Sequence, residues 1–408
     1  MLFGIGVSCL EGPAPDGHQA AYASALRPGD KTADWRVVKG FVPGSAATAK
    51  FVDARTTASG FGQLHVRSCS GASDTDQCPL ERIHDHFANT HSYFLNQLNA
   101  SLTEPVAWLE RQNAWARRQV SQQNTTFYQV LGLVLAQFDG LVAGYQMRHR
   151  AEPTAVPFMS RQDFIFLNGN GDLYDLTARQ PQMPDPSAMS PHELYMHIAL
   201  AGRCSALVTV SPDLSEILVG HSTWDSYSQI VRMFKHFQFD LTQPGLTAQQ
   251  TSYSSYPGEL FSDDDLYMMD SGLTVVSTTN KLFNLSLYAQ LTEASLVSWQ
   301  RIYNMSGLRA FRDGLAGDDF SLLSRHNPLA AVCARGDLDA RNPHPQGCFD
   351  SKVTSAPLAL RLEADVIAGP TTQDGIPPFR WTPAFDYVEH KGQPEEPEGH
   401  ILHEAGLA

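Results

Sequence analysis

Residues 204–226 contain two short β-branched runs that constrain the fold more than any other part of the chain. The runs are CSALVTV and EILVGHS, and the turn-forming stretch SPDLS separates them. Such runs, bounded by Ser, Pro and Asp, predict two strands joined as a hairpin. Because hairpin strands lie side by side, we expect His221 and Trp224 to fold back beside Cys204, which begins the first strand.

Outside this hairpin the pattern alternates between helical and extended segments. Apolar residues recur every three or four positions over 80–120 and 126–147, which predicts helices. The stretch DFIFLNGNGDLYDL at 163–176 is interpreted as a second hairpin around an Asn/Gly turn. A helix is expected after the central hairpin, with Ile230, Met233, Phe234 and Phe237 on one face. Further strands are expected at 273–278 and 283–289, so the fold class is mixed α/β or α+β.

The segment before Cys204 has the features of a loop followed by a helix. Residues 178–191 are Pro-rich and without pattern, and Ser190, Pro191 and Glu193 form a helix start of the capping-box type. The helix is expected to end near Gly202, so that Cys204 begins a strand directly after a linker. The last residues, HKGQPEEPEGHILHEAGLA, are expected to form a loose tail.

Composition limits the range of partners. Of the 408 residues, 42% are hydrophobic and 18% charged, as in folded proteins, and the chain is long enough for one large domain or two ordinary ones. The net charge of −14, without a basic cluster, argues against nucleic-acid binding. No uninterrupted run of 18 apolar residues is present, so we expect no membrane-spanning segment and at most peripheral membrane contact.

Several features favour the secretory route. Sequons occur at Asn99, Asn124, Asn284 and Asn304. The loop between Cys69 and Cys78 suits a local disulfide, and Cys333 and Cys348 could pair likewise. The first residues, MLFGIGVSCLEGPAPDG, lack a basic segment and reach Glu11 early, so they do not form a convincing signal peptide.

No metal or cofactor site is expected from the sequence. On a helix, His84 and His91 share one face while His86 points elsewhere, which argues against zinc. The oxygen-rich NGNGDLYD lacks the ligand spacing of an EF-hand. The acidic stretch SDDDLYMMD at 262–270 could bind a cation, but a solvated turn beside the central hairpin is the favoured interpretation.

Cys204 has two interpretations. A single Cys beside a strand commonly acts as a small buried hydrophobe. Alternatively, cleavage between Arg203 and Cys204 would make it the first residue of a new chain. Its α-amine, with an ordinary pKa of about 8, could then take the proton of its own thiol. In that mechanism His221 orients or polarises the substrate and does not act as the base.

Four long blocks resemble one known family. They are CSALVTV…ILVGHSTWDSYSQIVRMFKHF from Cys204, residues 254–280, residues 334–355 and residues 368–394. In this order they resemble the phospholipase B-like (lamina ancestor) family of the N-terminal nucleophile hydrolase superfamily. The resemblance implies an αββα sandwich, cut at Arg203–Cys204 into fragments 1–203 and 204–408 that stay associated as one domain.

The resemblance also implies an activity and a set of site residues. Cys204 matches the nucleophile, His221, Trp224 and Thr279 match active-site residues, and Arg325 matches the active-site arginine. The implied activity is hydrolysis of lipid ester or amide bonds, with phospholipid or another acyl lipid as substrate, no cofactor, and a lysosomal or secreted location.

The chain departs from the family pattern after VSWQR (297–301) and after FSLLSR (320–325). The first gap removes the segment with the family's active-site Asn and strands of the sandwich, so we expect an incomplete sandwich. These gaps are consistent with a divergent paralogue, an incomplete gene model or a degraded copy. The alternative function is therefore a catalytically inactive member that binds lipid or a protein partner.

Overall fold

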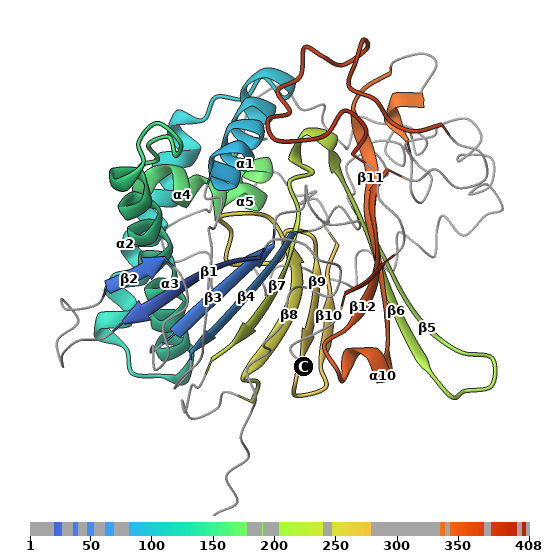
Figure 1. Cartoon of the computed structure of the whole chain (residues 1–408), viewed down its shortest axis with the longest axis horizontal. Coiled ribbons are helices and arrows are strands. Elements are labelled where there is room, and N and C mark those ends of the chain that lie inside the picture. The colour runs from blue at the N-terminus through green and yellow to red at the C-terminus, as the bar shows by residue number, and fades with distance from the viewer. Residues whose placement is uncertain are drawn as a thin grey trace, which may run out of the picture.

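Two β-sheets and a group of helices make up the described part of the chain (Figure 1). The computed structural model describes residues 20–26, 36–39, 47–52, 62–68, 81–177, 190, 204–239, 247–278, 335–338, 343–370, 377–397 and 402–404. In the view of Figure 1 the helices, the first sheet and the second sheet follow one another from left to right. The expected α+β class is confirmed, and the αββα sandwich remains a prediction.

The first sheet has eight strands in the order β10-β9-β8-β7-β4-β3-β1-β2. It combines β1 (Ala20–Leu26), β2 (Arg36–Lys39), β3 (Ala47–Val52) and β4 (Gly62–Ser68) with β7 (Met233–Gln238), β8 (Gln250–Ser255), β9 (Leu266–Met269) and β10 (Thr274–Val276). Strands β4 and β7 pair in parallel, from Gly62 opposite Met233 to Arg67 opposite Gln238. This pairing joins parts of the chain that lie before and after Cys204 into one sheet.

The second sheet has five strands in the order β13-β12-β11-β6-β5. They are β5 (Ser205–Val210), β6 (Ile217–Ser226), β11 (Gln346–Ser355), β12 (Ala364–Pro370) and β13 (Leu402–Glu404), and the short helix α10 (Ala356–Ala359) connects β11 to β12. Strands β5 and β6 pair antiparallel from Ser205 opposite Ser222 to Val210 opposite Ile217. The expected central hairpin is therefore confirmed.

The two sheets share one apolar core. Phe234 of β7 and Leu266 and Met268 of β9 pack with residues of α10, β12 and the connection between them. Alanines at 359, 364 and 368 contribute small side chains to this cluster, which lets the sheets approach closely. The core brings the start of β9 toward β6 and β11, and that is where the candidate site lies.

Apart from the short α10, the described α-helices precede the central hairpin in sequence. They are α1 (Glu81–Ser92), the π-helical turn η3 (Tyr93–Gln97), α2 (Thr103–Gln122), α3 (Thr126–Ala151), α4 (Arg161–Leu167) and α5 (Asn170–Thr177). The helices expected over 80–120 and 126–147 are confirmed. The helix expected after Ser190, and the strand expected at 283–289, lie outside the described residues.

Helix α3 contains an 18-residue window with a mean hydropathy of 1.3, long and apolar enough to cross a membrane by length and composition alone. Polar residues such as Asp139 interrupt it, so it is not a continuous apolar run. The same helix packs through Phe138, Val142 and Tyr145 into a core shared with α1 and α4. Only 11% of the window is buried among the described residues.

The expected hairpin at 163–176 is wrong, because this stretch forms α4 and α5. Ser160 accepts a hydrogen bond from the Asp163 backbone N–H, and the Asp163 carboxylate accepts one from the Ser160 N–H, a capping box that starts a helix. Asn168 then donates to the Phe164 and Gly258 carbonyls. The Asn/Gly turn therefore joins two helices.

The expected helix at 230–237 is also wrong, because residues 233–238 form β7 between β4 and β8. Phe234 packs into the core between the sheets, and Lys235, which points to the other face, is buried as well. A strand covered on both faces carries no clear alternation of apolar and polar residues. The spacing of its apolar residues therefore matched the period of a helix.

The expected loose tail is in part a structured element. Within it, the Lys391 N–H donates to the Asn89 side chain, and the Gln393 side chain donates to the Ser228 carbonyl. Residues 402–404 form β13, which pairs with β12. The Lys391 carbonyl also accepts from the Asn89 side chain, so residues 391–393 are held against α1 and the turn after β6.

Candidate active site

Cys204 directly precedes β5, the edge strand of the five-stranded sheet. Its φ of 64° lies in the left-handed region, which residues with a Cβ adopt only at a cost of the order of 1–2 kcal/mol. The Trp224 backbone N–H donates to the Cys204 Sγ across the hairpin at 3.4 Å. The thiol is a free one, and it is partly buried.

His221 lies on β6, opposite Ala206 of β5. Only 2% of the residue is exposed, and neither ring nitrogen has a partner within ordinary hydrogen-bond geometry among the described residues, with the Ser277 backbone nearby. The ring points at Asp265, with 3.9 Å between His221 Nε2 and Asp265 Oδ2. A buried imidazole without hydrogen bonds is uncommon in proteins, because such a group costs free energy to desolvate.

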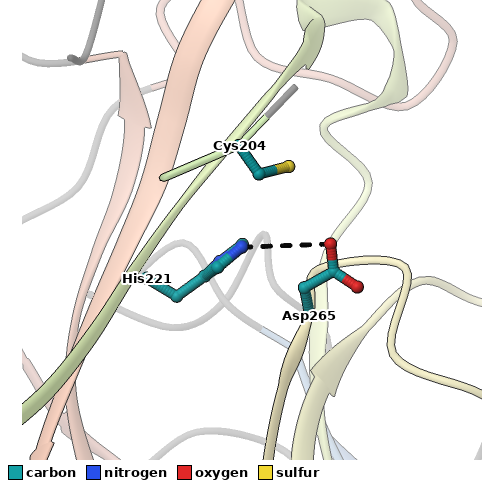
Figure 2. A group of neighbouring side chains, drawn as sticks. All are labelled: Cys204, His221 and Asp265. Atoms are coloured by element: carbon teal, nitrogen blue, oxygen red, sulfur yellow. Dashed lines mark ion pairs between the residues drawn. The ribbon is translucent and has the colours of Figure 1, made fainter. Parts of the chain in front are cut away.

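Asp265 comes from the other sheet, one residue before β9. It has a φ of 58°, and the Ser277 hydroxyl donates to its Oδ1 at 2.7 Å. Figure 2 shows the side chains of Cys204, His221 and Asp265 pointing toward one another. One donor atom from each, a sulfur, a nitrogen and an oxygen, lie within 4.8 Å of one another.

The electrostatics of this cluster keep the thiol and the imidazole uncharged. Burial, and next the Asp265 carboxylate, raise the pKa of Cys204 well above its usual value. Burial, and next the Lys352 ammonium, lower the pKa of His221 to about 3. Burial raises the pKa of Asp265 to about 6, against hydrogen bonds from Ser277 and the Cys204 thiol that lower it. The uncut chain therefore holds its thiol in the protonated form.

A buried ion pair lies under the cluster. Lys352 Nζ of β11 lies 2.8 Å from Asp264 Oδ1 and donates to the Thr223 Oγ1 at 2.9 Å. Asp264 and Lys352 are both fully buried, and Asp264 immediately precedes Asp265. The pair fixes the start of β9 against β6 and β11, and so fixes the backbone that carries Asp265.

The expectation of a solvated acidic turn at 262–270 is therefore wrong. Asp264 is buried in the ion pair with Lys352, and Asp265 faces the thiol. Asp264, Asp265 and Lys352 are site residues that were not expected from the sequence. The only local signal was the run of three Asp residues directly before an apolar strand, in a block that carried the family resemblance.

The other expected site residues are only partly described. The structure brings Cys204 and His221 together, and Trp224 contacts the thiol through its backbone. Arg203, Thr279 and Arg325 lie outside the described residues. Among the helical histidines, His86 is buried with its Nε2 2.8 Å from Glu259 Oε1.

The expected glycosylation and disulfide sites are also only partly within the described residues. Asn99 and Asn124 are exposed, in the connections before and after α2, whereas Asn284 and Asn304 lie outside the described residues. Cys69, Cys78 and Cys333 also lie outside them, and Cys348 is buried in β11. Both proposed disulfides stay predictions.

Comparison with known proteins identifies the family. The model of the family described as Phospholipase B matches residues 47–310 and 312–398 of this chain. The chain belongs to the phospholipase B family. Its matched region includes both sheets from β3 to β12 and all of the candidate site.

Two curated relatives match over most of their lengths, and a third matches over a shorter region at higher identity. Phospholipase B-like 1 of Homo sapiens is 26% identical, over 94% of this chain and 91% of the relative. Phospholipase B of Crotalus adamanteus is 27% identical, over 76% of this chain and 77% of the relative. Phospholipase B-like protein B of Dictyostelium discoideum is 32% identical, over 48% and 34%.

The match to the human relative also shows a difference in length. It extends over 518 positions, whereas 94% of 408 residues is about 384. About 130 positions of the match therefore have no residue in this chain. The human relative carries internal segments that this chain lacks, in line with the gaps expected from the sequence.

Proposed function

We propose that this chain is a phospholipase B-like hydrolase of lipid ester or amide bonds with Cys204 as an N-terminal nucleophile. Family membership supports a lipid hydrolase in general. The observation that carries the specific mechanism is the position of Cys204. It directly precedes β5, the end strand of the described five-stranded sheet, with a left-handed φ, and its thiol lies beside His221 and Asp265.

The first step of the proposal is self-cleavage between Arg203 and Cys204. The Cys204 sulfur attacks the carbonyl carbon of Arg203, the C–N bond breaks, and the thiol proton passes to the released α-amine. Water then hydrolyses the thioester, leaving a carboxylate on Arg203 and a free thiol on Cys204. Release of the left-handed φ at Cys204 favours this step, since the new terminus no longer has a fixed φ.

Cleavage also supplies the base that the uncut site lacks. The thiol has a strongly raised pKa, and the pKa of His221, about 3, makes it a poor base at neutral pH. A free α-amine on the same residue, with an ordinary pKa of about 8, takes the thiol proton directly. The thiolate then attacks the acyl carbonyl of the lipid, an acyl-enzyme forms, and water releases the acid.

His221 and Trp224 have supporting roles in this mechanism. Neutral His221 orients the carbonyl of the substrate or donates a hydrogen bond to it. The Trp224 backbone N–H, which already donates to the sulfur, stabilises the thiolate. Thr279 and Arg325 are proposed as further active-site residues on the resemblance alone.

Many contacts between the proposed fragments 1–203 and 204–408 would hold them together as one domain. Strand β4 from the first fragment pairs with β7 from the second over six residue pairs. The His86 side chain of α1 lies 2.8 Å from Glu259, and Asn89 hydrogen-bonds Lys391. Exposed Asn99 and Asn124 support glycosylation, and so a lysosomal or secreted location.

One observation favours the alternative, an inactive member that binds lipid or a protein partner. The β5–β6 hairpin exposes large apolar side chains on both strands and at its turn, and Leu207, Val208 and Leu214 are 63%, 62% and 80% exposed. Exposed apolar side chains gathered on one element are typical of a binding surface. An uncut chain that binds phospholipid vesicles without turnover would fit this alternative.

The deciding experiment is the intact mass and N-terminal sequence of purified protein after incubation in mildly acidic buffer. We expect two fragments, the second beginning Cys-Ser-Ala-Leu, and hydrolysis of lipid ester or amide substrates by the cut protein. Cys204→Ala should remain a single chain without activity. A wild-type chain that stays uncut, or Cys204→Ala and Cys204→Ser proteins as active as wild type, would contradict the proposal.

A further inference from the structure

We propose that the uncut chain binds one Zn²⁺ ion through Cys204 Sγ, the His221 imidazole and the Asp265 carboxylate, and that the ion blocks cleavage before Cys204. The binding part of this inference depends only on the three side chains. The regulatory part rests on the proposed function, because it assumes that the Cys204 thiol is the attacking group.

The donor set fits zinc. Thiolate, imidazole and carboxylate are its three common protein ligands, and a site with three of them leaves a fourth position for water. Bonds of about 2.0–2.3 Å put the ligand atoms of a tetrahedral ion about 3.3–3.8 Å apart. Here the three donor atoms lie within 4.8 Å, with 3.9 Å between His221 Nε2 and Asp265 Oδ2. Small side-chain rotations bring them to bonding distance.

The arrangement converges on one point, as metal ligands do. In a Cys–His–Asp relay the imidazole separates the thiol from the carboxylate and uses a different nitrogen for each. Here the Asp265 carboxylate lies beside the thiol itself and accepts its hydrogen bond. The imidazole, the thiol and the carboxylate all point into the same space in Figure 2.

His221 provides the independent sign of a ligand. The residue is 2% exposed, and neither ring nitrogen has a partner within ordinary hydrogen-bond geometry among the described residues; the Ser277 backbone is close enough only to raise the pKa of the ring slightly against the effect of burial. A buried nitrogen without a partner costs free energy, and a bound cation satisfies it. His221 Nε2 faces Asp265 and accepts no hydrogen bond, as expected of a nitrogen that binds a metal ion.

The surrounding charge also favours a cation. The Asp265 and Asp225 carboxylates both act on the Cys204 thiol. The cation that acts on it, Lys352, is already paired with Asp264. A divalent ion that replaces the thiol proton would balance this excess of carboxylates.

Zinc binding would stop cleavage for a simple reason. A sulfur lone pair shared with Zn²⁺ is no longer available to attack the Arg203 carbonyl. Asp265 and His221, held as ligands, could not assist the reaction. Removal of the ion would then free the thiol and permit cleavage.

The test begins with binding by the full-length chain after treatment with a chelator. Co²⁺ serves as a spectroscopic probe, because thiolate coordination gives a near-ultraviolet charge-transfer band, and Zn²⁺ affinity follows from competition with a chromophoric chelator. We expect one site that weakens by about 10–100-fold or more in Cys204→Ser, His221→Gln and Asp265→Asn. The matched controls, His84→Gln and Asp213→Asn, should bind as wild type does.

Comparison with the variants separates this site from other thiols of the chain. Thermal unfolding of each variant shows whether it is folded. Cys204→Ala is a second variant without the sulfur, and its smaller side chain fits the space that Cys204 occupies. Equal Zn²⁺ affinity and an equal Co²⁺ band in wild type and in all folded variants would overturn the proposal.

Cleavage assays distinguish the two proposals. We expect stoichiometric Zn²⁺ to slow cleavage of the wild-type chain and the chelator to restore it. Cleavage with no three-residue zinc site refutes this inference and leaves the proposed function standing. A zinc site in a chain that never cuts, with or without chelator, refutes the proposed self-cleavage. Zinc binding that leaves the cleavage rate unchanged refutes the regulatory part.

Discussion

Asp264 and Lys352 form a fully buried ion pair between the two sheets, with 2.8 Å between Asp264 Oδ1 and Lys352 Nζ. Thr223 of β6 contacts both partners through its hydroxyl. Asp264 is joined through the chain to Asp265, and Lys352 lies in β11 opposite His221 of β6. The pair therefore connects the backbone positions of two residues of the candidate active site.

Removal of one partner of this pair should destabilise the protein strongly. Lys352→Met leaves the Asp264 carboxylate buried without its cation, which costs about 3–5 kcal/mol of unfolding free energy. Asp264→Asn combined with Lys352→Met removes both charges and should recover part of that loss. Urea denaturation of the single and double variants measures the coupling.

The exposed ion pair between Arg111 and Glu104 is the matched control. Arg111→Gln should change the unfolding free energy by less than about 1 kcal/mol. Equal losses for Lys352→Met and Arg111→Gln would show that burial of the Asp264–Lys352 pair has no energetic consequence.

The segment directly before the expected tail should contribute core stability. Trp381 is fully buried and stacks on His390, with 4.3 Å between ring centroids. Trp381→Ala should therefore cost about 3–5 kcal/mol in urea denaturation. Tyr387 lies in the same segment but is 72% exposed, so Tyr387→Ala should stay within about 0.5 kcal/mol of wild type. Similar small losses for both variants would mean that the segment does not pack as described.

Local sequence signals predicted the parts of the site that lie close together along the chain. The β5–β6 hairpin follows from two β-branched runs and a Ser/Pro/Asp turn, and it alone brings His221 near Cys204. Asp265 reaches the same point from the other sheet through tertiary packing, 61 residues after Cys204. No local pattern distinguishes an acidic turn that faces water from one that faces a buried Lys352.

The same distinction explains the errors in secondary structure. The helices over 80–120 have one buried face, so their period was visible in the sequence. β7 is covered on both faces, and its spacing imitated a helix. The stretch 163–176 depended on Asn168, whose bonds to Gly258 and Leu260 come from a distant loop. Elements determined by distant partners were those that the sequence predicted wrongly.

Gly258 should not tolerate a side chain. It has a φ of 84°, and an added Cβ would lie 2.8 Å from the Ile83 Cγ2 and 3.1 Å from the Leu167 Cδ1. Gly258→Ala should therefore lower the unfolding free energy by more than about 1 kcal/mol, through both backbone strain and overpacking.

The matched control is Gly144, inside α3, which has no atom within 4 Å of an added Cβ. Gly144→Ala should instead stabilise the protein by about 0.5–1 kcal/mol. Thermal unfolding of the two variants in one buffer compares them, and a shift of the same sign for both would contradict the prediction.

His236 should make the protein less stable as the pH falls. Its ring, on β7, is fully buried, and its Nδ1 forms a hydrogen bond of 2.7 Å with the Ser252 hydroxyl. The ring also stacks on His65, with 4.4 Å between the ring centroids. Burial, and next the Lys50 ammonium, lower its pKa from 6.5 to about 3. The unfolded chain therefore binds one more proton than the folded chain between these two values. The stabilisation is complete above pH 6.5 and is lost as the pH falls toward 3, at about 1.4 kcal/mol per pH unit.

His236→Gln removes this titration, so its unfolding free energy should fall less steeply with decreasing pH than that of wild type. Urea denaturation across this pH range gives both slopes, with His149→Gln, a partly exposed position, as control. Parallel curves for wild type and His236→Gln would show that His236 titrates alike in the folded and unfolded chains.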